Sequence, residues 1–207
     1  MTIPTGEHDS AARPVGRGRV ARLVTEVLAP APIAAALLLV VGWQSTPTIA
    51  HGLAWGLLAA LLASLVPMLF VLRRVRRGEL TDHHIRLREQ RPLPLLVGIA
   101  CVLAGLGPML AWGAPRALVA LLAAMLTGLV ASLLVTLVWK MSLHTGVAAG
   151  SVAILVLVFG PALLALAPIV GLVGWARIEV GDHSPAQVAV GAVLGAAVAA
   201  AVFSLLR

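Results

Sequence analysis

The fold is decided by long apolar stretches, of which residues 116–139 are typical: RALVALLAAMLTGLVASLLVTLVW. After Arg116 this stretch carries no charged residue. A helix of about 20 residues is long enough to cross the ~30 Å hydrocarbon core of a bilayer. The apolar residues are continuous and do not alternate with polar ones, which favours a helix over a strand of a transmembrane barrel.

The whole chain has a composition that matches such stretches. Of its 207 residues, 60% are hydrophobic and 11% are charged, and the mean hydropathy is +1.03. Soluble domains are about 45–50% apolar with roughly 25% charge, so a soluble enzyme, a disordered chain and a fibrous repeat are excluded. The sequence predicts an all-α, polytopic transmembrane helical bundle of six to seven spans, from apolar runs at 26–43, 49–72, 93–112, 116–139, 145–159, 161–177 and 185–206.

Several local features refine this prediction. Gly160-Pro161 divides a run that is too long for one straight span, which predicts a tight hairpin of two short helices. The pattern Gly191-x3-Gly195 predicts close packing between helices. Residues 1–21 show no periodicity and are predicted to be a disordered cytosolic tail, which leaves 22–207 as the transmembrane domain.

The basic residues predict the orientation of the chain. The formal net charge is +7. If seven spans alternate, one side receives 13 of the 15 Lys and Arg residues, and the other receives only Arg116 and Arg207. Because Lys and Arg are enriched in cytoplasmic loops, we expect a multi-pass protein of the plasma (inner) membrane with a cytoplasmic N-terminus.

Three polar clusters lie on this basic side, at residues 81–92, 139–146 and 175–187. Two spans separate each cluster from the next, so all three are expected to converge at one membrane surface. Together they supply cations, histidines and helix starts, which suit the binding of an anion. Two histidines with Arg and Lys also suit phosphoryl transfer without a metal or other cofactor.

The spacing resembles that of the type 2 phosphatidic acid phosphatase superfamily. That family carries the motifs Lys-x6-Arg-Pro, Pro-Ser-Gly-His and Ser-Arg-x5-His-x3-Asp. This chain has Arg91-Pro92 for the first, Met141-Ser142-Leu143-His144 for the second, and Ala176-Arg177, five residues, His183, three residues and Gln187 for the third. The resemblance covers roughly residues 80–195.

The resemblance implies a role for each matching residue. His183 is expected to be the nucleophile that forms a phosphohistidine, and His144 the general acid. Arg91, Arg177, Ser142 and the N–H of Leu143 are expected to bind phosphate. Lys140 is added as a charge partner because it lies two residues before Ser142.

The chain departs from the family pattern at several positions. Met141 and Leu143 replace proline and glycine in the second motif. His84 stands where the family has its first lysine and is expected to bind phosphate only when protonated, and Arg86 or Arg88 could replace that charge. Gln187 replaces the aspartate that orients the nucleophile. If a helix begins near residue 185, Gln187 lies about one turn from His183, and its Oε1 can accept the Nδ1–H. Asp182 and Glu179 are alternative local replacements.

Two hypotheses of different classes follow. The first is a metal-independent membrane phosphatase, acting on a lipid or polyprenyl phosphate or diphosphate at the cytoplasmic face. The Ala-, Arg-, Gly- and Val-rich composition suggests a bacterium and an isoprenoid pathway. The alternative is a weak or inactive family member that binds lipid phosphates or acts in membrane assembly. A transporter is disfavoured because the polar clusters lie at one surface, and the short basic tail gives no argument for a nucleic-acid partner.

Overall fold

The computed structural model describes residues 15–207, and these residues are almost entirely helical, with no strand among them. The expected all-α fold is confirmed. The α-helices are α1 (Val15–Val27), α2 (Pro30–Gln44), α3 (Ile49–Ala60), α4 (Val66–Arg76), α5 (Pro92–Ala111), α6 (Arg116–Val138), α7 (Leu143–Phe159), α8 (Ala167–Glu179) and α9 (Pro185–Leu206). A π-helical turn joins α3 to α4, and 3₁₀ turns precede α5 and α8.

Five helical segments in the described part of the chain are long and apolar enough to cross a membrane: Ile49–Arg76, Arg88–Ala111, Arg116–Val138, Pro161–Glu179 and Pro185–Leu206. Helices α1 and α2 form a sixth candidate, bent by 43° at their junction. The apolar helix α7 is shorter, at 17 residues. Every apolar run of the sequence therefore corresponds to a helical segment, as expected of a multi-pass membrane protein.

The N-terminal prediction was wrong for residues 15–21, which belong to α1. Residues 1–14 lie outside the described part of the chain. Helix α1 packs against α8, and Ala21 and Thr25, one turn apart, are its buried positions. Burial against a distant helix stabilises this segment, although its own sequence is polar and rich in glycine.

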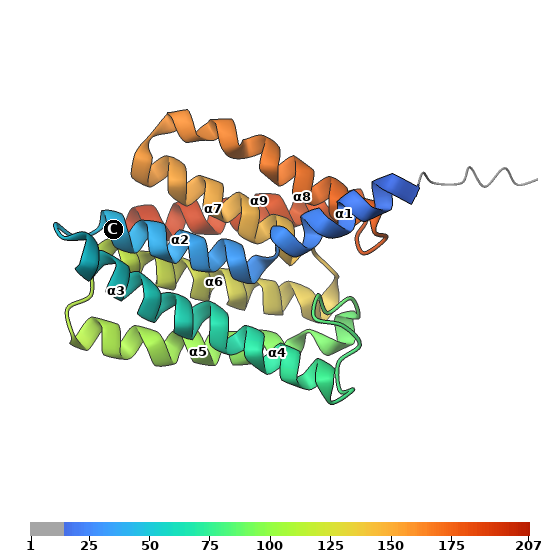
Figure 1. Cartoon of the computed structure of the whole chain (residues 1–207), viewed down its shortest axis with the longest axis horizontal. Coiled ribbons are helices and arrows are strands. Elements are labelled where there is room, and N and C mark those ends of the chain that lie inside the picture. The colour runs from blue at the N-terminus through green and yellow to red at the C-terminus, as the bar shows by residue number, and fades with distance from the viewer. Residues whose placement is uncertain (1–14) are drawn as a thin grey trace, which may run out of the picture.

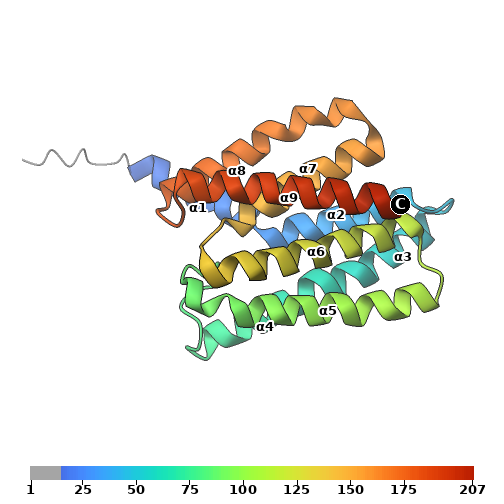
Figure 2. The same cartoon turned by 180° about the vertical axis from the view of Figure 1, so that it is seen from behind.

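The helices run back and forth along one direction, so the connections gather at two ends (Figure 1). One end carries α1 and the α4–α5, α6–α7 and α8–α9 connections, and the opposite end carries the C-terminus with the α2–α3, α5–α6 and α7–α8 connections. The view from behind shows the same arrangement (Figure 2). The three polar clusters thus lie at one end, as the alternation of spans predicts.

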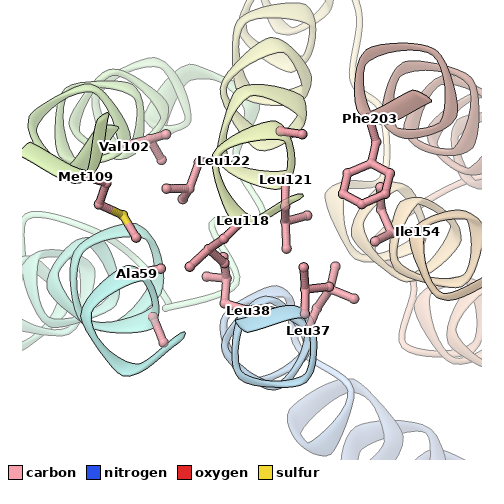
Figure 3. Packing of buried hydrophobic residues seen from close by; sticks show 13 residues of the cluster. Leu37, Leu38, Ala59, Val102, Met109, Leu118, Leu121, Leu122, Ile154 and Phe203 are labelled. Carbon is pink, nitrogen blue, oxygen red and sulfur yellow. The ribbon is translucent and has the colours of Figure 1, made fainter. Parts of the chain in front are cut away.

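The apolar core is centred on α6. Leu118, Leu121 and Leu122 of α6 are almost fully buried. They project towards residues from α2, α3 and α5 on one side, and Ile154 and Phe203 lie on the other side (Figure 3). This core holds the spans in a fixed relation, which the polar end requires if groups from different spans are to act together.

Small residues bring α7 and α9 into close contact. A Cβ atom on Gly191 would collide with the carbonyl oxygen of Ser142, and one on Gly195 would collide with that of Gly146. The expected role of Gly191-x3-Gly195 is confirmed, because only glycine permits this approach. The start of α7 is consequently bound to the start of α9, where the N–H of Ser142 donates to the carbonyl of Gln187 at 3.1 Å.

The predicted hairpin is also confirmed. Helix α7 ends at Phe159, and a 3₁₀ turn begins at Pro161 and leads into α8. Gly160, between them, has φ of 101°, a conformation that residues with a side chain rarely adopt. The hairpin returns the chain to the polar end, which places Arg177 there.

Candidate functional site

Arg177, near the C-terminus of α8, is fully buried at the centre of the polar end. The chain turns back over it, because the amide N–H groups of Asp182 and His183 both donate to the Arg177 carbonyl, at 3.1 and 3.2 Å. Gly181, at φ of 77°, permits this turn. Asp182 Oδ2 then lies 2.8 Å from Arg177 Nη2, and Arg86 Nε lies 3.1 Å from Asp182 Oδ1.

His183 follows this turn and is held in one tautomer. Its Nδ1 lies 3.0 Å from Gln187 Oε1, the contact that the one-turn spacing predicts. The same Oε1 accepts the N–H of Ser184 at 3.2 Å, within a capping box at the start of α9. Because Oε1 is an acceptor, Nδ1 carries the hydrogen, and Nε2 keeps its lone pair.

Arg91 connects the three clusters. Its Nε donates to the Ile85 carbonyl at 3.0 Å, and its Nη1 donates to the Met141 carbonyl at 2.7 Å. Its Nη2 lies 3.4 Å from His183 Nε2 and donates to it. Met141 stands where the resembling family has proline, but its contribution here is a backbone carbonyl, which any residue supplies.

The second cluster forms the start of α7. The Ser142 hydroxyl accepts the N–H of Thr145 at 3.4 Å as a helix cap. Leu143 is the first residue of α7, where the backbone N–H has no partner within the helix. His144 is buried, and its ring centroid lies 5.2 Å from that of His84. Lys140 Nζ donates to the Asp182 carbonyl at 2.6 Å, so Lys140 also faces this region.

Several buried polar atoms at this end lack hydrogen bonds within the described structure. They include Nε, Nη1 and Nη2 of Arg177 and Nε2 of His144. The Arg177–Asp182 pair is close, but its geometry is not that of a hydrogen bond, since Asp182 Oδ2 also has no hydrogen-bond partner. The Asp182 carboxylate offsets the charge of this buried guanidinium. Its remaining N–H groups are donors for which a phosphate or a second carboxylate would supply oxygens.

The electrostatic surroundings keep His183 neutral. Burial, together with the nearby Arg91 and Arg177 cations, lowers the pKa of His183 to about 3. Burial and the Arg91 charge also lower the pKa of Lys140. Burial is the main cause that lowers the pKa of His84. A neutral imidazole near two guanidinium groups has the properties required of a nucleophile that attacks a bound anion.

A cavity of about 300 Å³ extends from this end into the bundle. His84, Arg91, Leu143 and His144 line its polar end. The remainder is mainly apolar and is lined by residues of α2, α4, α6, α7 and α9 and of the turn before α4. His183 and Arg177 do not line it, but Arg91 does, and Arg91 Nη2 lies 3.4 Å from His183 Nε2. The shape is that of a polar recess continuous with an apolar channel.

The chain matches no protein-family model, no curated protein and no solved structure.

Arg88 is a predicted phosphate ligand, but its side chain donates hydrogen bonds to the end of α6 and, within residues 15–207, to none of the other predicted ligands. Its Nη1 donates to the carbonyls of Thr136 and Leu137, at 3.3 and 3.0 Å, near the C-terminus of α6. These contacts place the guanidinium in a helix-capping role. Asp182, considered as a partner for His183, instead carries the ion pairs with Arg177 and Arg86.

Glu26 was missed by sequence reasoning. Its two carboxylate oxygens lie 3.0 Å from His84 Nε2 and 3.1 Å from His83 Nε2. It is the single carboxylate between residues 10 and 78, and a charge beside an apolar run is a recognisable signal in a membrane protein. These three side chains form the one group of three His, Cys, Asp or Glu residues, within 15–207, whose geometry could hold a metal ion.

Proposed function

We propose that this protein is an integral membrane phosphatase that removes phosphate from a lipid or polyprenyl phosphate or diphosphate. One observation carries the proposal: the unprotonated Nε2 of His183 lies 3.4 Å from Arg91 Nη2, and burial together with the Arg91 and Arg177 cations lowers the pKa of this imidazole. Nucleophile and anion-binding groups at one place are the requirements of phosphoryl transfer through a covalent intermediate.

The proposed reaction has two steps. In the first, His183 Nε2 attacks phosphorus, the P–O bond to the lipid oxygen breaks, and protonated His144 gives its proton to that oxygen. The charge of the bound phosphate favours the imidazolium form of His144. In the second, His144 takes a proton from water, the water oxygen bonds to phosphorus, and the P–N bond breaks. Inorganic phosphate leaves, and both histidines return to their starting states.

Arg91, Arg177 and Ser142, with the N–H of Leu143, are assigned to the phosphate oxygens. In the first step Arg91 gives up its 3.4 Å contact with His183 Nε2 and donates to the phosphate instead. Gln187 holds the His183 tautomer throughout, as its 3.0 Å contact with Nδ1 allows. Without a carboxylate at this position the imidazolium-like transition state is less stabilised, so we expect a slow enzyme.

The apolar cavity supports a substrate with a hydrocarbon tail. Its polar end includes Arg91 and His144, and its walls are mainly apolar, so a headgroup and a tail can be accommodated together. The charge count places the polar end at the cytoplasmic face. A reporter fused after Arg207 is therefore expected outside the cell, and one inserted near Gly78 inside.

The first prediction tests hydrolysis directly. Purified protein in detergent with EDTA should release phosphate from a panel of phosphatidic acid, polyprenyl phosphates and polyprenyl diphosphates. His183→Ala should abolish release, and His144→Ala should lower it by about 10²–10⁴-fold. His51→Ala is the matched control, because His51 lies at the opposite end, near Trp55 and Gly113. Release that persists in His183→Ala would refute the mechanism.

The presence of Gln187 favours a second candidate, a lipid-phosphate-binding protein without turnover. In this case the wild type would bind the same lipids but release no phosphate, and no acid-labile phosphohistidine would form with radiolabelled substrate. Binding should then weaken in Arg177→Ala, while His183→Ala retains it.

A further inference from the structure

A second constellation lies beside the anion site and is built from two distant parts of the chain. Glu26 comes from α1, and His83 and His84 come from the connection between α4 and α5. Both imidazoles direct Nε2 at the same carboxylate, at 3.1 and 3.0 Å. The two rings are in contact, with centroids 4.0 Å apart.

The ligand atoms have the spacing of a small coordination site. One ring nitrogen from each histidine and a carboxylate oxygen all lie within 4.8 Å of one another. Ligands about 2.0–2.1 Å from a tetrahedral zinc ion are about 3.3 Å apart. Each Nε2 lies close to that distance from one oxygen of the carboxylate, His83 from Oε2 at 3.1 Å and His84 from Oε1 at 3.0 Å. Two imidazoles and one carboxylate are a common ligand set for zinc, with a fourth position left to water.

The surroundings fix the imidazoles for this role. The N–H of His84 donates to Asp82 Oδ1 at 2.8 Å, which holds the backbone between the two histidines. The His84 side chain is only 8% exposed, whereas Glu26 is 55% exposed, so the group is closed on the protein side and open to solvent on the other.

We propose that Glu26, His83 and His84 bind one divalent transition-metal ion of the zinc class. The ion joins α1 to the 81–91 connection at the rim of the cavity, with water as the fourth ligand. It has no part in the two chemical steps above, and the proposal does not rest on phosphatase activity. Its function is to fix α1 over the polar end.

The test is direct metal binding by the full chain in detergent. Co²⁺ added to metal-free wild type should give the visible absorption of tetrahedral cobalt, saturating at one equivalent, and Zn²⁺ should displace it. Glu26→Gln and His83→Ala should each weaken Co²⁺ binding by at least about 10-fold, and the double variant should lose the signal. His51→Ala, a histidine outside the group, is the control and should bind as wild type does.

A second measurement reports the position of α1. Arg17, Arg19 and Arg22 are exposed on α1, and trypsin cleaves such a helix only when it opens locally. Zn²⁺ should slow cleavage at these three sites in wild type and leave the double variant unaffected. Glu26→Gln keeps an amide that can still contact the histidines, so its melting temperature separates lost metal binding from misfolding.

The proposal fails if wild type binds no Co²⁺, or if the folded double variant binds it as tightly as wild type. Either result would leave the three side chains as a hydrogen-bonded cluster. Neither result bears on hydrolysis, because phosphate release is measured in EDTA. A failed phosphatase assay, in turn, does not affect the Co²⁺ titration.

Discussion

The two ends of the bundle use arginine in different ways. At the end that carries the C-terminus, Arg116 Nε donates to the Leu206 carbonyl at 3.0 Å, and Arg207 donates to the Leu157 carbonyl. At the polar end, Arg177 is fully buried and none of its nitrogens has a hydrogen bond in the described structure. The first pair satisfies helix carbonyls, whereas the Arg177 side chain donates to no carbonyl in the described structure and lies in an ion pair with Asp182.

The cavities at the two ends also differ in whether charged residues line them. The end opposite the polar clusters has a hollow of about 440 Å³, lined by Thr46, His51, Trp55 and neighbours, and its lining includes no Lys, Arg, Asp or Glu. The cavity at the polar end includes Arg91 and His144. The contacts of its guanidinium nitrogens therefore indicate whether an arginine near a membrane surface has a structural or a binding role. Arg88, although at the polar end, caps α6 and resembles Arg116.

The largest effect on phosphate release is expected when the buried guanidinium of Arg177 is removed. Arg177→Ala should lower kcat/KM for phosphate release by about 10²–10³-fold, since truncating a buried, charged contact costs about 2–5 kcal/mol. Arg88→Ala is the matched control and should retain activity within a few-fold. Comparable losses in both variants would mean that the contacts of Arg88 do not distinguish it from Arg177.

A smaller effect is expected inside the cavity. Gly128 lines the cavity, and a Cβ added there meets no atom within 4 Å. Gly128→Leu should raise KM about 10-fold for a long-tailed substrate through lost apolar contact, with little change for a short-chain analogue. Gly107 has an equally open Cβ position but is not in the cavity lining, so Gly107→Leu should change neither. If both leucine variants changed KM equally, the hydrocarbon tail of the substrate would not bind in this cavity.

The pH dependence of kcat/KM tests the electrostatic surroundings of His183 at the polar end. With its pKa at about 3, His183 stays neutral down to acid pH, and wild-type activity should not lose its nucleophile above that value. Gln187→Glu preserves the length of the side chain but adds a negative charge, which favours the imidazolium and raises its pKa by about one to three units. The acid limb of kcat/KM should move to higher pH by that amount relative to wild type on the same substrate. An unmoved limb would show that His183 does not control it.

The smallest effect is expected at the opposite end. Arg116→Ala removes the donor to the Leu206 carbonyl and should lower the free energy of unfolding by about 0.3–1 kcal/mol, seen as a small drop in melting temperature in detergent. Phosphate release per folded molecule should not change. A large loss of release would mean that the two ends are coupled.

Sequence reasoning was most successful where the physics is local or periodic. Hydropathy located every helical segment of the bundle except α1, because a span must bury about 20 apolar residues. Alternation of spans predicted that the polar clusters meet, and the one-turn spacing predicted the His183–Gln187 contact. The Gly160-Pro161 hairpin and the close packing at Gly191 and Gly195 followed from residues that constrain the backbone directly.

The predictions were incomplete wherever a side chain could choose among several partners. Arg88 and Arg91 are three residues apart with the same chemistry, yet one contacts α6 and the other His183. The contact of Glu26 with two histidines spans 57 and 58 positions, and no local pattern encodes such a pairing. Nor could polar, glycine-containing residues 15–21 be expected to form a helix without α8 to pack against.

The sequence by itself therefore predicted that the chain lies in a membrane and where its spans are, because transfer of a helix into lipid depends on its composition and length. It also predicted the end of the bundle at which the charged residues gather, because successive spans alternate in direction. The tertiary structure decided which guanidinium groups donate to helix carbonyls, as Arg88 does, and which are buried at the polar end without such a bond within residues 15–207, as Arg177 is. That decision depends on the direction of each side chain from its helix, and on neighbours far away in the chain. It is the reason that Arg177, and not Arg88, is the arginine to test first.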